Sequence, residues 1–318
     1  MNLTEDELLE AIRRVCSGAG PEVLVGVGDD AAVLAPTTGE LVITTDALVE
    51  RVHFELGSVA ARDLGYKAIA VNVSDVAAMG ASPRAAVCQL SLSGAVDAAW
   101  VMELFGGMRE ACDEYALWLV GGNLSRSGEV EIVVTATGEV APGRAVLRSG
   151  ARPGHRLVVT GDLGASAAGL RLSRERAIDG DEQRALIRRS VRPTARVGEG
   201  AALARAGATA MIDVSDGLAL DLSRLCRASG VGAAIELDAV PVANGATLPE
   251  ALGGGEDYEL LATLPSAAAA EEARRELKEG LGVPLTEIGT IVVGAGVLAP
   301  GPDGVRRPLD IMGWDHFA

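Results

Sequence analysis

The segment LVITTD (41–46) is a short apolar run that ends in a carboxylate, and the segment AARDLGYKAIAVNVSDVAAM (60–79) follows it. The first run, bounded by Gly39 and Asp46, predicts a β-strand. In the second segment apolar residues recur every three or four positions, which predicts a helix that carries Asp75 on its apolar stripe. Carboxylates are seldom found at the end of a buried strand or on the apolar stripe of a helix unless a cation binds them. The two segments therefore predict an α+β domain with a cation site.

Two more acidic clusters, Gly28-Asp29-Asp30 and Asp213-Val214-Ser215-Asp216, each follow an expected strand. Oxygen-only clusters of this kind suit Mg²⁺, which prefers carboxylates, waters and substrate phosphates. Each cluster also has a structural interpretation, because Gly-Asp pairs often form turns and aspartates often cap helices. Their joint occurrence favours a metal role.

The apolar periodicity divides the chain into two α/β domains. Helices are expected at 4–17, 60–79, 97–117, 217–228 and 266–279, and strands at 23–27, 41–45, 85–91, 129–140, 156–160 and 208–214. The stretch RSGARPG (148–154) is polar and rich in Gly and Pro, so we place the boundary there and predict domains at 1–148 and 149–318.

Composition narrows the class of function. The chain has 318 residues, is 48% hydrophobic and carries a net charge of −16, so it is a globular protein and an unlikely nucleic-acid binder. No apolar run reaches the ~18 residues of a membrane span, and the acidic start lacks a signal-peptide pattern, which favours the cytoplasm. The four scattered cysteines indicate reduced core residues. With only Lys67 and Lys278 as lysines, a Walker-type phosphate loop is excluded.

Taken together, the motifs resemble those of the thiamine-monophosphate kinases, a family of the aminoimidazole-ribonucleotide-synthetase-like superfamily. The matching stretches are GVGDDAAVL (26–34), ITTDALVERVHF (43–54), KAIAVNVSDVAAMGASP (67–83), GGN (121–123), RSGARPG (148–154), VRPTARV (191–197), IDVSDGLALDL (212–222), GGEDYEL (254–260) and GWDHF (313–317). They run almost end to end. The VHF after TTD and the final GWDHF are typical of the thiamine-phosphate branch.

The resemblance implies an α+β/α-β two-domain fold. Its N-terminal domain, with a mixed sheet, would bind ATP and metal and pair with a second copy into a shared barrel. Its C-terminal α/β sandwich domain would complete the active site. The implied reaction is direct transfer of the γ-phosphoryl group of ATP to thiamine monophosphate, assisted by several Mg²⁺ ions, in a homodimer without nucleic-acid or membrane partners.

The resemblance also implies a role for individual residues. The implied metal ligands are Asp30, Thr44, Thr45, Asp46, Asp75, Asn123, Asp213 and Asp216. The implied ATP contacts are Tyr115, Gly121, Gly122, Arg148 and Ser215. The implied contacts to thiamine monophosphate are His53, Glu256, Asp257 and Trp314. Many relatives carry Asp where this chain has Asn123, which keeps a carbonyl ligand but removes one charge.

The chemistry fits a protein with few histidines. A phosphate monoester is already largely ionised near neutral pH, because its second pKa is about 6, so no separate general base is expected. Transfer then depends mainly on positioning and electrostatics. Two alternatives stay open: a sister ATP-dependent synthetase that releases phosphate, and a non-catalytic nucleotide-binding protein. Taken singly, His53 and Trp314 also have structural interpretations, as a hydrogen-bonded histidine and a core aromatic.

Overall fold

A computed structural model describes residues 4–16, 20–175, 180–301, 303–311 and 313–314. Its contacts divide the chain into two compact units. The first comprises residues 1–76 and 81–143, and the second comprises residues 77–80 and 144–318. The division after residue 143 lies slightly before the predicted boundary at 148. Each unit is described by itself.

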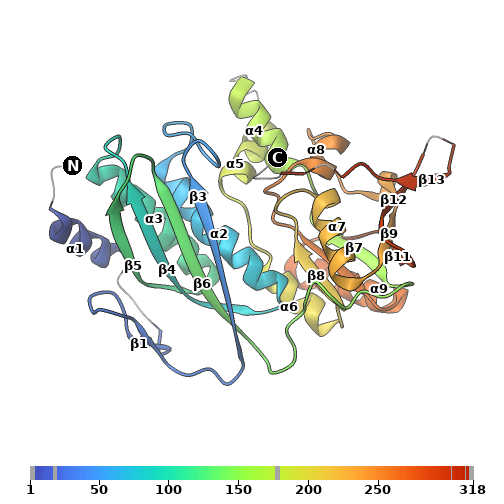
Figure 1. Ribbon diagram of the computed structural model, residues 1–318, viewed down its shortest axis with the longest axis horizontal. Helices are drawn as coiled ribbons and strands as arrows, with labels where there is room; N and C mark the ends of the chain where they lie inside the picture. Colours follow the sequence, from blue (N-terminus) through green and yellow to red (C-terminus); the bar gives the residue numbers. More distant parts are fainter. Residues whose placement is uncertain (1–3, 17–19, 176–179, 302, 312, 315–318) are drawn as a thin grey trace. The chain divides into compact units, whose positions relative to one another are not determined.

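The first unit is built on a four-stranded mixed sheet (Figure 1). Its strands, in spatial order, are β3 (Glu40–Val49), β6 (Glu131–Val140), β4 (Ser82–Leu92) and β5 (Trp118–Arg126). The β3–β6 and β6–β4 pairs are antiparallel, whereas β4 and β5 are parallel. Along β6 every second residue is buried, as expected for a sheet with one covered face. The strands β1 (Val23–Val25) and β2 (Val33–Leu34) form a separate two-stranded antiparallel sheet.

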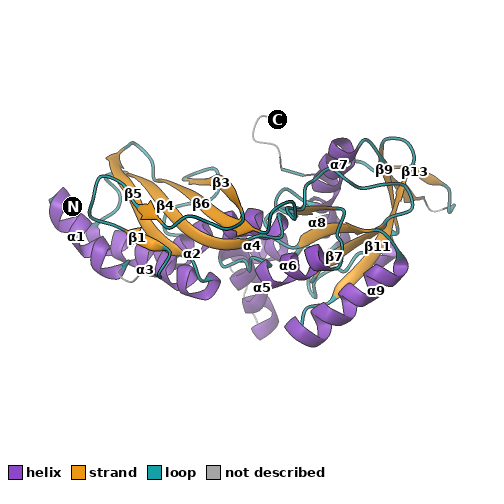
Figure 2. Ribbon diagram, turned by 90° about the horizontal axis from the view of Figure 1, so that it is seen from below, coloured by secondary structure: helices purple, strands orange, loops and turns teal. Residues whose placement is uncertain are grey.

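Two long helices, α2 (Ala61–Ala78) and α3 (Ala98–Tyr115), cover one face of this sheet, and α1 (Glu5–Val15) packs against α3 (Figure 2). The crossing of α2 and α3 depends on glycine. A Cβ at Gly65 would lie 1.9 Å from the Leu104 carbonyl oxygen, and one at Gly107 would lie 1.7 Å from that of Arg62. No side chain fits at either position, so these two glycines set how closely the helices approach.

The second unit contains a seven-stranded sheet. Its strands, in spatial order, are β13 (Arg306–Pro308), β12 (Gly296–Pro300), β9 (Gly232–Ile235), β11 (Leu285–Val292), β7 (Arg156–Thr160), β10 (Leu260–Leu264) and β8 (Ala210–Asp213). The β12–β9 pair is parallel and the other pairs are antiparallel.

Helices cover both faces of the seven-stranded sheet. Leu157 and Val159 of β7 belong to a core cluster with α7 (Leu218–Ser229) and α8 (Leu248–Gly253), whereas Val158 belongs to a second cluster with α6 (Val197–Arg205) and α9 (Ala267–Glu276). This alternation is the two-residue period of a strand buried on both faces. The helices α4 (Ala165–Glu175) and α5 (Asp181–Val191) form a further pair, and η1 (Leu237–Ala239) and a π-turn, η2 (Leu277–Leu281), complete the unit.

The structure confirms the two-domain α/β architecture with mixed sheets and the helices and strands expected from periodicity. It also contains elements that periodicity did not predict, among them β5 in the first unit and β9 to β13 in the second. All four cysteines are buried and free, as predicted. None of the helices in the described ranges is both long and apolar enough to cross a membrane.

Candidate functional site

In the first unit, Thr44 and Asp75 meet on the helix-covered side of the sheet. The Thr44 hydroxyl Oγ1 donates a hydrogen bond of 2.5 Å to Asp75 Oδ2. Thr44 lies in β3 and Asp75 in the last turns of α2, so packing of the helix on the sheet joins the two motifs TTD and VSD. Both side chains are partly exposed. Two oxygen donors thus lie together at a position that solvent reaches.

The neighbouring residues of β3 extend this oxygen-rich edge. Thr45 points to the opposite, open face of the sheet, where its hydroxyl donates to the Val134 carbonyl and accepts from Thr135. Asp46 is exposed, and its Oδ1 accepts from the Ala47 N–H. Asp30 is also exposed.

His53 belongs to the same part of the chain. Its Nδ1 accepts a 3.0 Å bond from the Val49 N–H and so holds the turn that follows β3. This contact matches the structural interpretation of His53 as a hydrogen-bonded histidine.

The GGN motif lies on β5, at the opposite edge of the sheet from β3. A Cβ at Gly122 would lie 2.0 Å from the Cys88 carbonyl oxygen, so strand packing alone demands this glycine. Asn123 is exposed on the open face, opposite Gln89 of β4. Because β6 and β4 separate β3 from β5, the backbones of β3 and β5 lie about 14 Å apart, at roughly 4.8 Å per strand.

Tyr115, predicted to lie near the nucleotide, is buried at the end of α3. Its hydroxyl lies 2.9 Å from that of Tyr66, and the two rings pack 6.1 Å apart. Burial, followed by the neighbouring Tyr115, raises the pKa of Tyr66 far above its ordinary value. The two tyrosine hydroxyls thus form a hydrogen bond in the interior of the first unit.

The Asp213–Asp216 motif forms the strand-to-helix junction between β8 and α7. Asp213 is buried, and Asp221 one turn into the helix is fully buried. The Asp221 carboxylate accepts from the backbone N–H groups of Ser215 (3.1 Å) and Asp216 (2.9 Å), and from Arg224 (2.7 Å). Arg224 also pairs with Asp216. Burial raises the pKa of Asp221.

Arg224 and Asp221 therefore hold this junction in shape while Asp216 is still partly exposed. In the second unit, Asp216 also provides a carbonyl for the Trp314 N–H, at 3.0 Å. The Trp314 side chain is 50% exposed. About half of this residue is therefore reached by solvent. The motif residues that follow it at 315–317 lie outside the described residues.

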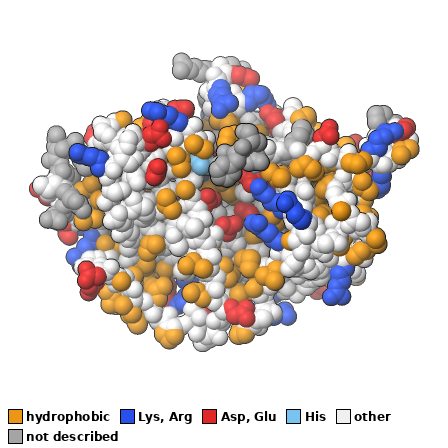
Figure 3. Space-filling view, in the orientation of Figure 1, with side chains coloured by type: hydrophobic (Ala, Val, Ile, Leu, Met, Phe, Trp, Pro, Cys, Tyr) orange, Lys and Arg blue, Asp and Glu red, His pale blue; other side chains and the backbone are white. Residues whose placement is uncertain are grey.

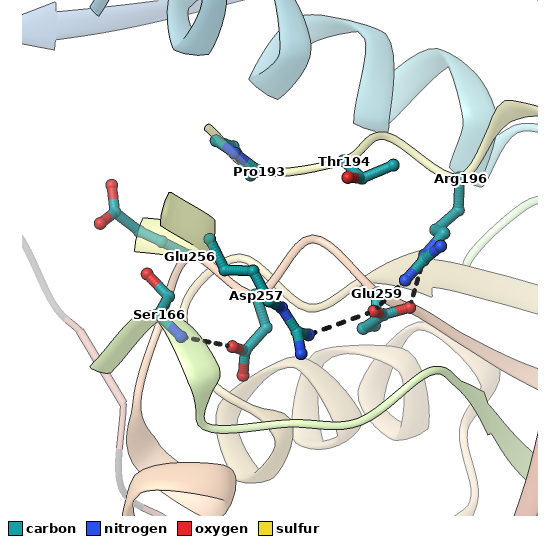
Figure 4. A pocket seen from close by; sticks show the side chains of 8 residues that line it. Ser166, Pro193, Thr194, Arg196, Glu256, Asp257 and Glu259 are labelled. Atoms are coloured by element: carbon teal, nitrogen blue, oxygen red, sulfur yellow. Dashed lines mark hydrogen bonds and ion pairs between the residues drawn. The ribbon is translucent and has the colours of Figure 1, made fainter. Parts of the chain in front are cut away.

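A polar cavity of about 200 Å³ lies in the second unit (Figure 4). It is lined by Ser166, Arg189, Pro193, Thr194, Arg196, Glu256, Asp257 and Glu259. At its floor Arg196 forms a bidentate pair with the buried Glu259, with N–O distances of 2.5 and 2.8 Å. Arg189 approaches the same carboxylate at 3.5 Å and also pairs with Asp162. Burial raises the pKa of Glu259, and Arg196 opposes that shift.

The loop that carries Glu256 is strained. Glu256 and Tyr258 have φ values of 66° and 53°, in the left-handed region that side chains other than glycine rarely adopt. Backbone bonds from the Glu256 N–H to the Ser215 carbonyl (2.7 Å) and from the Tyr258 N–H to the Val214 carbonyl (2.9 Å) fix this shape. The carboxylate of Glu256 points away from the Arg196–Glu259 pair (Figure 4). Such strain often marks a ligand-binding position.

Asp257, predicted to contact the acceptor, caps a helix in this structure. Its carboxylate accepts from the N–H groups of Gly164 (2.6 Å) and Ser166 (3.1 Å) at the start of α4. Burial raises its pKa to about 7, although the two N–H donors oppose the shift. The strand-to-helix turn at 161–166 is thus occupied by a carboxylate of the protein itself.

Arg148 is exposed, and its carbonyl accepts from the Ser229 hydroxyl at 3.0 Å. On the face shown in Figure 3, Lys and Arg side chains are interspersed with Asp and Glu. This mixture is unlike the continuous basic surface of a nucleic-acid binder.

The predicted metal ligands fit Mg²⁺ in chemistry, because they are carboxylate, hydroxyl and amide oxygens. All of them are exposed or partly exposed except Asp213, which is buried. They do not form one cluster: within the described ranges no three His, Cys, Asp or Glu side chains are grouped to hold an ion. The residues that sequence reasoning missed are Asp221, Arg224, Arg189, Arg196, Glu259 and Gln89. Asp221, Arg196 and Glu259 lie inside quoted motifs, which is the signal in the sequence that could have identified them.

Comparison with known proteins gives a consistent result. Residues 28–140 match the family model for the N-terminal domain of AIR synthase related proteins, and residues 152–298 match that for their C-terminal domain. The chain is 41% identical over 310 residues to the thiamine-monophosphate kinase of Salmonella typhimurium, covering 93% of each protein. It is 37% identical to that of Aquifex aeolicus, covering 92% of each.

Solved structures of thiamine-monophosphate kinases have the same fold as this chain. The thiamine-monophosphate kinase of Stenotrophomonas maltophilia superposes with a TM-score of 0.83 at 37% identity, covering 95% of this chain and 98% of that one. AaThiL in complex with AMPPCP and TMP gives a TM-score of 0.78 at 35% identity, covering 100% and 99%. Escherichia coli HypE, a hydrogenase maturation protein, gives 0.79 at only 22% identity over 97% of each chain, which shows a shared fold alone.

Proposed function

Because the chain belongs to the AIR synthase related family and, within it, to the thiamine-monophosphate kinases, we propose that it transfers the γ-phosphoryl group of ATP to thiamine monophosphate. The products are thiamine diphosphate and ADP. The observation that carries this proposal is the match at 41% identity over 93% of both proteins. The AaThiL complex with AMPPCP, an ATP analogue, and TMP supports the same pair of substrates.

The described residues divide this work between two groups. Thr44, Thr45, Asp46 and Asp75 in the first unit, with Asp213 and Asp216 in the second, would hold the Mg²⁺ ions. When bound, these ions neutralise phosphate charge and align the reacting groups. The Thr44–Asp75 bond keeps two of the ligands in place before any ion arrives.

Glu256 and Trp314 would bind the acceptor. Thiamine is a flat cation, so a partly exposed carboxylate and a half-exposed indole are suitable partners; the stacking alone is worth roughly 0.5–2 kcal/mol. The strained loop and its two bonds to residues 214 and 215 present Glu256 without further ordering on binding. The attacking phosphate oxygen is ionised near neutral pH and needs no base from the protein.

A homodimer accounts for two features of the first unit. Leu41, Ile43 and Val87 expose 57%, 67% and 39% of their surface on β3 and β4. Exposed apolar groups on an uncovered sheet face suit a partner surface. In addition, the metal ligands of β3 and Asn123 of β5 lie at opposite edges of the sheet, so a second copy would bring them together.

The test is a product assay with purified protein, ATP, Mg²⁺ and thiamine monophosphate, in which thiamine diphosphate, ADP and free phosphate are measured. We expect equal amounts of thiamine diphosphate and ADP, and loss of both in Asp75→Asn. Free phosphate without thiamine diphosphate would instead support the sister synthetase activity. Neither product with intact ATP binding would support the non-catalytic alternative.

A further inference from the structure

A row of four polar side chains crosses the open face of the first unit's sheet from β4 to β5. Gln89 and Asn123 lie directly opposite each other on the two strands, as do Ser91 and Ser125. We propose that Gln89 is a positioning residue that orients the Asn123 amide so that its oxygen, and not its nitrogen, faces a bound Mg²⁺. This inference rests on the proposed function.

The hydrogen bonds of this row run in one direction. Asn123 donates from Nδ2 to Gln89 Oε1 at 2.6 Å. Gln89 in turn donates from Nε2 to the Ser125 hydroxyl at 2.9 Å, with a longer contact of 3.4 Å to Ser91. The two hydroxyls are linked at 3.1 Å. Gln89 therefore uses its oxygen on Asn123 and its nitrogen on the serines.

This arrangement determines which end of Asn123 is available. With Nδ2 bound to Gln89, the oxygen Oδ1 is the end left over, and among the described residues no group bonds to it. If the Asn123 amide reversed alone, its oxygen would face the Gln89 oxygen and one hydrogen bond would be lost. Reversal of both amides would need the serine hydroxyls to exchange roles as well. Gln89 thus raises the free energy of the orientation in which Asn123 cannot bind a cation.

The chemistry explains why an amide needs such a partner. A carboxylate presents an oxygen to a metal in either rotation, whereas an amide presents one oxygen and one NH₂ group that a cation repels. Residues behind a metal ligand commonly fix its orientation in this way. Gln89 is partly exposed on an uncovered face, so core packing does not account for its presence.

The experiment measures Mn²⁺ affinity by the EPR signal of free Mn²⁺, at a fixed concentration of AMPPCP and against a protein-free blank. We expect Gln89→Met, which has similar length but no hydrogen bond, to weaken Mn²⁺ binding by roughly 10-fold. Gln89→Glu, which still accepts from Asn123 Nδ2, should bind Mn²⁺ at least as tightly as wild type. Each variant is checked for an unchanged Tm.

The decisive comparison repeats Gln89→Met in an Asn123→Asp background. In that background Gln89→Met should not weaken Mn²⁺ binding, because a carboxylate presents an oxygen in either rotation. The positioning role would be overturned if Gln89→Met weakened Mn²⁺ binding equally in both backgrounds, or did not weaken it in the background that keeps Asn123. Either result would leave the proposed function intact, because that function is tested by the kinase assay. If Asn123→Ala binds Mn²⁺ like wild type, Asn123 is no ligand and the inference fails at its premise. If wild type makes no thiamine diphosphate, it is the proposed function that fails.

Discussion

Residue by residue, the second unit shows how buried charge is used to hold a binding loop. Glu259 is 1% exposed, yet Arg196 supplies two hydrogen bonds and Thr160 a third at 2.7 Å. A buried carboxylate is tolerated only with such partners, and removing one of them is costly. Since Glu259 follows the strained Glu256–Tyr258 segment, this network anchors one end of the loop that presents Glu256.

Asp257 predicts a pH dependence of stability. Burial raises its pKa from 3.8 to about 7 in the folded state. Between these values the folded protein keeps a proton that the unfolded chain has lost. The unfolding free energy contributed by Asp257 therefore falls as pH rises from about 4 to about 7, and is constant above that. Asn at this position does not titrate.

The measurement is urea denaturation of wild type and Asp257→Asn at several pH values between 5 and 8. The difference in unfolding free energy, wild type minus variant, should decrease up to about pH 7 and then level off. A difference that increases over this range would mean that the N–H donors of Gly164 and Ser166 outweigh burial.

The motifs identified the acidic residues but not their partners. Asp75, Asp213 and Asp216 could be named from local sequence because each lies in a recognisable acidic cluster, whereas Glu256 was implied only by the family resemblance. Arg196 and Glu259 are 63 residues apart, and Asp257 caps a helix that begins 92 residues before it. Local patterns carry no information on such pairs, which only the folded sheet brings together. For the same reason the contact of Asp257 with the start of α4 could not be predicted from the sequence.

Among the elements, α2, α3, β4 and β6 followed from periodicity, but β5 did not. Its sequence, WLVGGNLSR, contains two adjacent glycines, which weaken a strand pattern. The structure shows why glycine is needed there: β5 pairs so closely with β4 that Gly122 leaves no room for a side chain. Gly122 thus weakens the strand pattern in the sequence and also permits β5 to pair with β4.

The crossing of α2 and α3 predicts opposite effects for two adjacent glycines of α3. In Gly107→Ala the new Cβ would meet the Arg62 carbonyl at 1.7 Å, a backbone clash that should cost about 3 kcal/mol or more. In Gly106→Ala it would meet only the mobile end of the Arg62 side chain, at 2.9 Å. That variant should gain up to about 1 kcal/mol from helix propensity. Urea denaturation of both variants would test this, and equal effects would show that the crossing is not glycine-dependent.

For the whole molecule, the spatial order β3-β6-β4-β5 decides how a complete metal site can form. Thr44 and Asp75 lie at one edge of the sheet and Asn123 at the other. If all three serve one site in the proposed homodimer, each copy of the chain would supply one half to each of two sites. The acidic clusters indicated metal ligands from the sequence itself, but Asn123 and the dimer were implied only by the family resemblance, because strand order is not visible in local patterns.

A shared site predicts complementation between inactive variants. Asp75→Asn and Asn123→Ala, each inactive alone, are mixed in equal amounts and allowed to exchange subunits. Half of the dimers are then mixed, and each has one site with both halves intact, so about one quarter of wild-type kinase activity should return. Thr44→Ala mixed with Asp75→Asn is the matched control: both changes affect the same half, and no activity should return. A first mixture as inactive as its components would show that each chain builds its site alone.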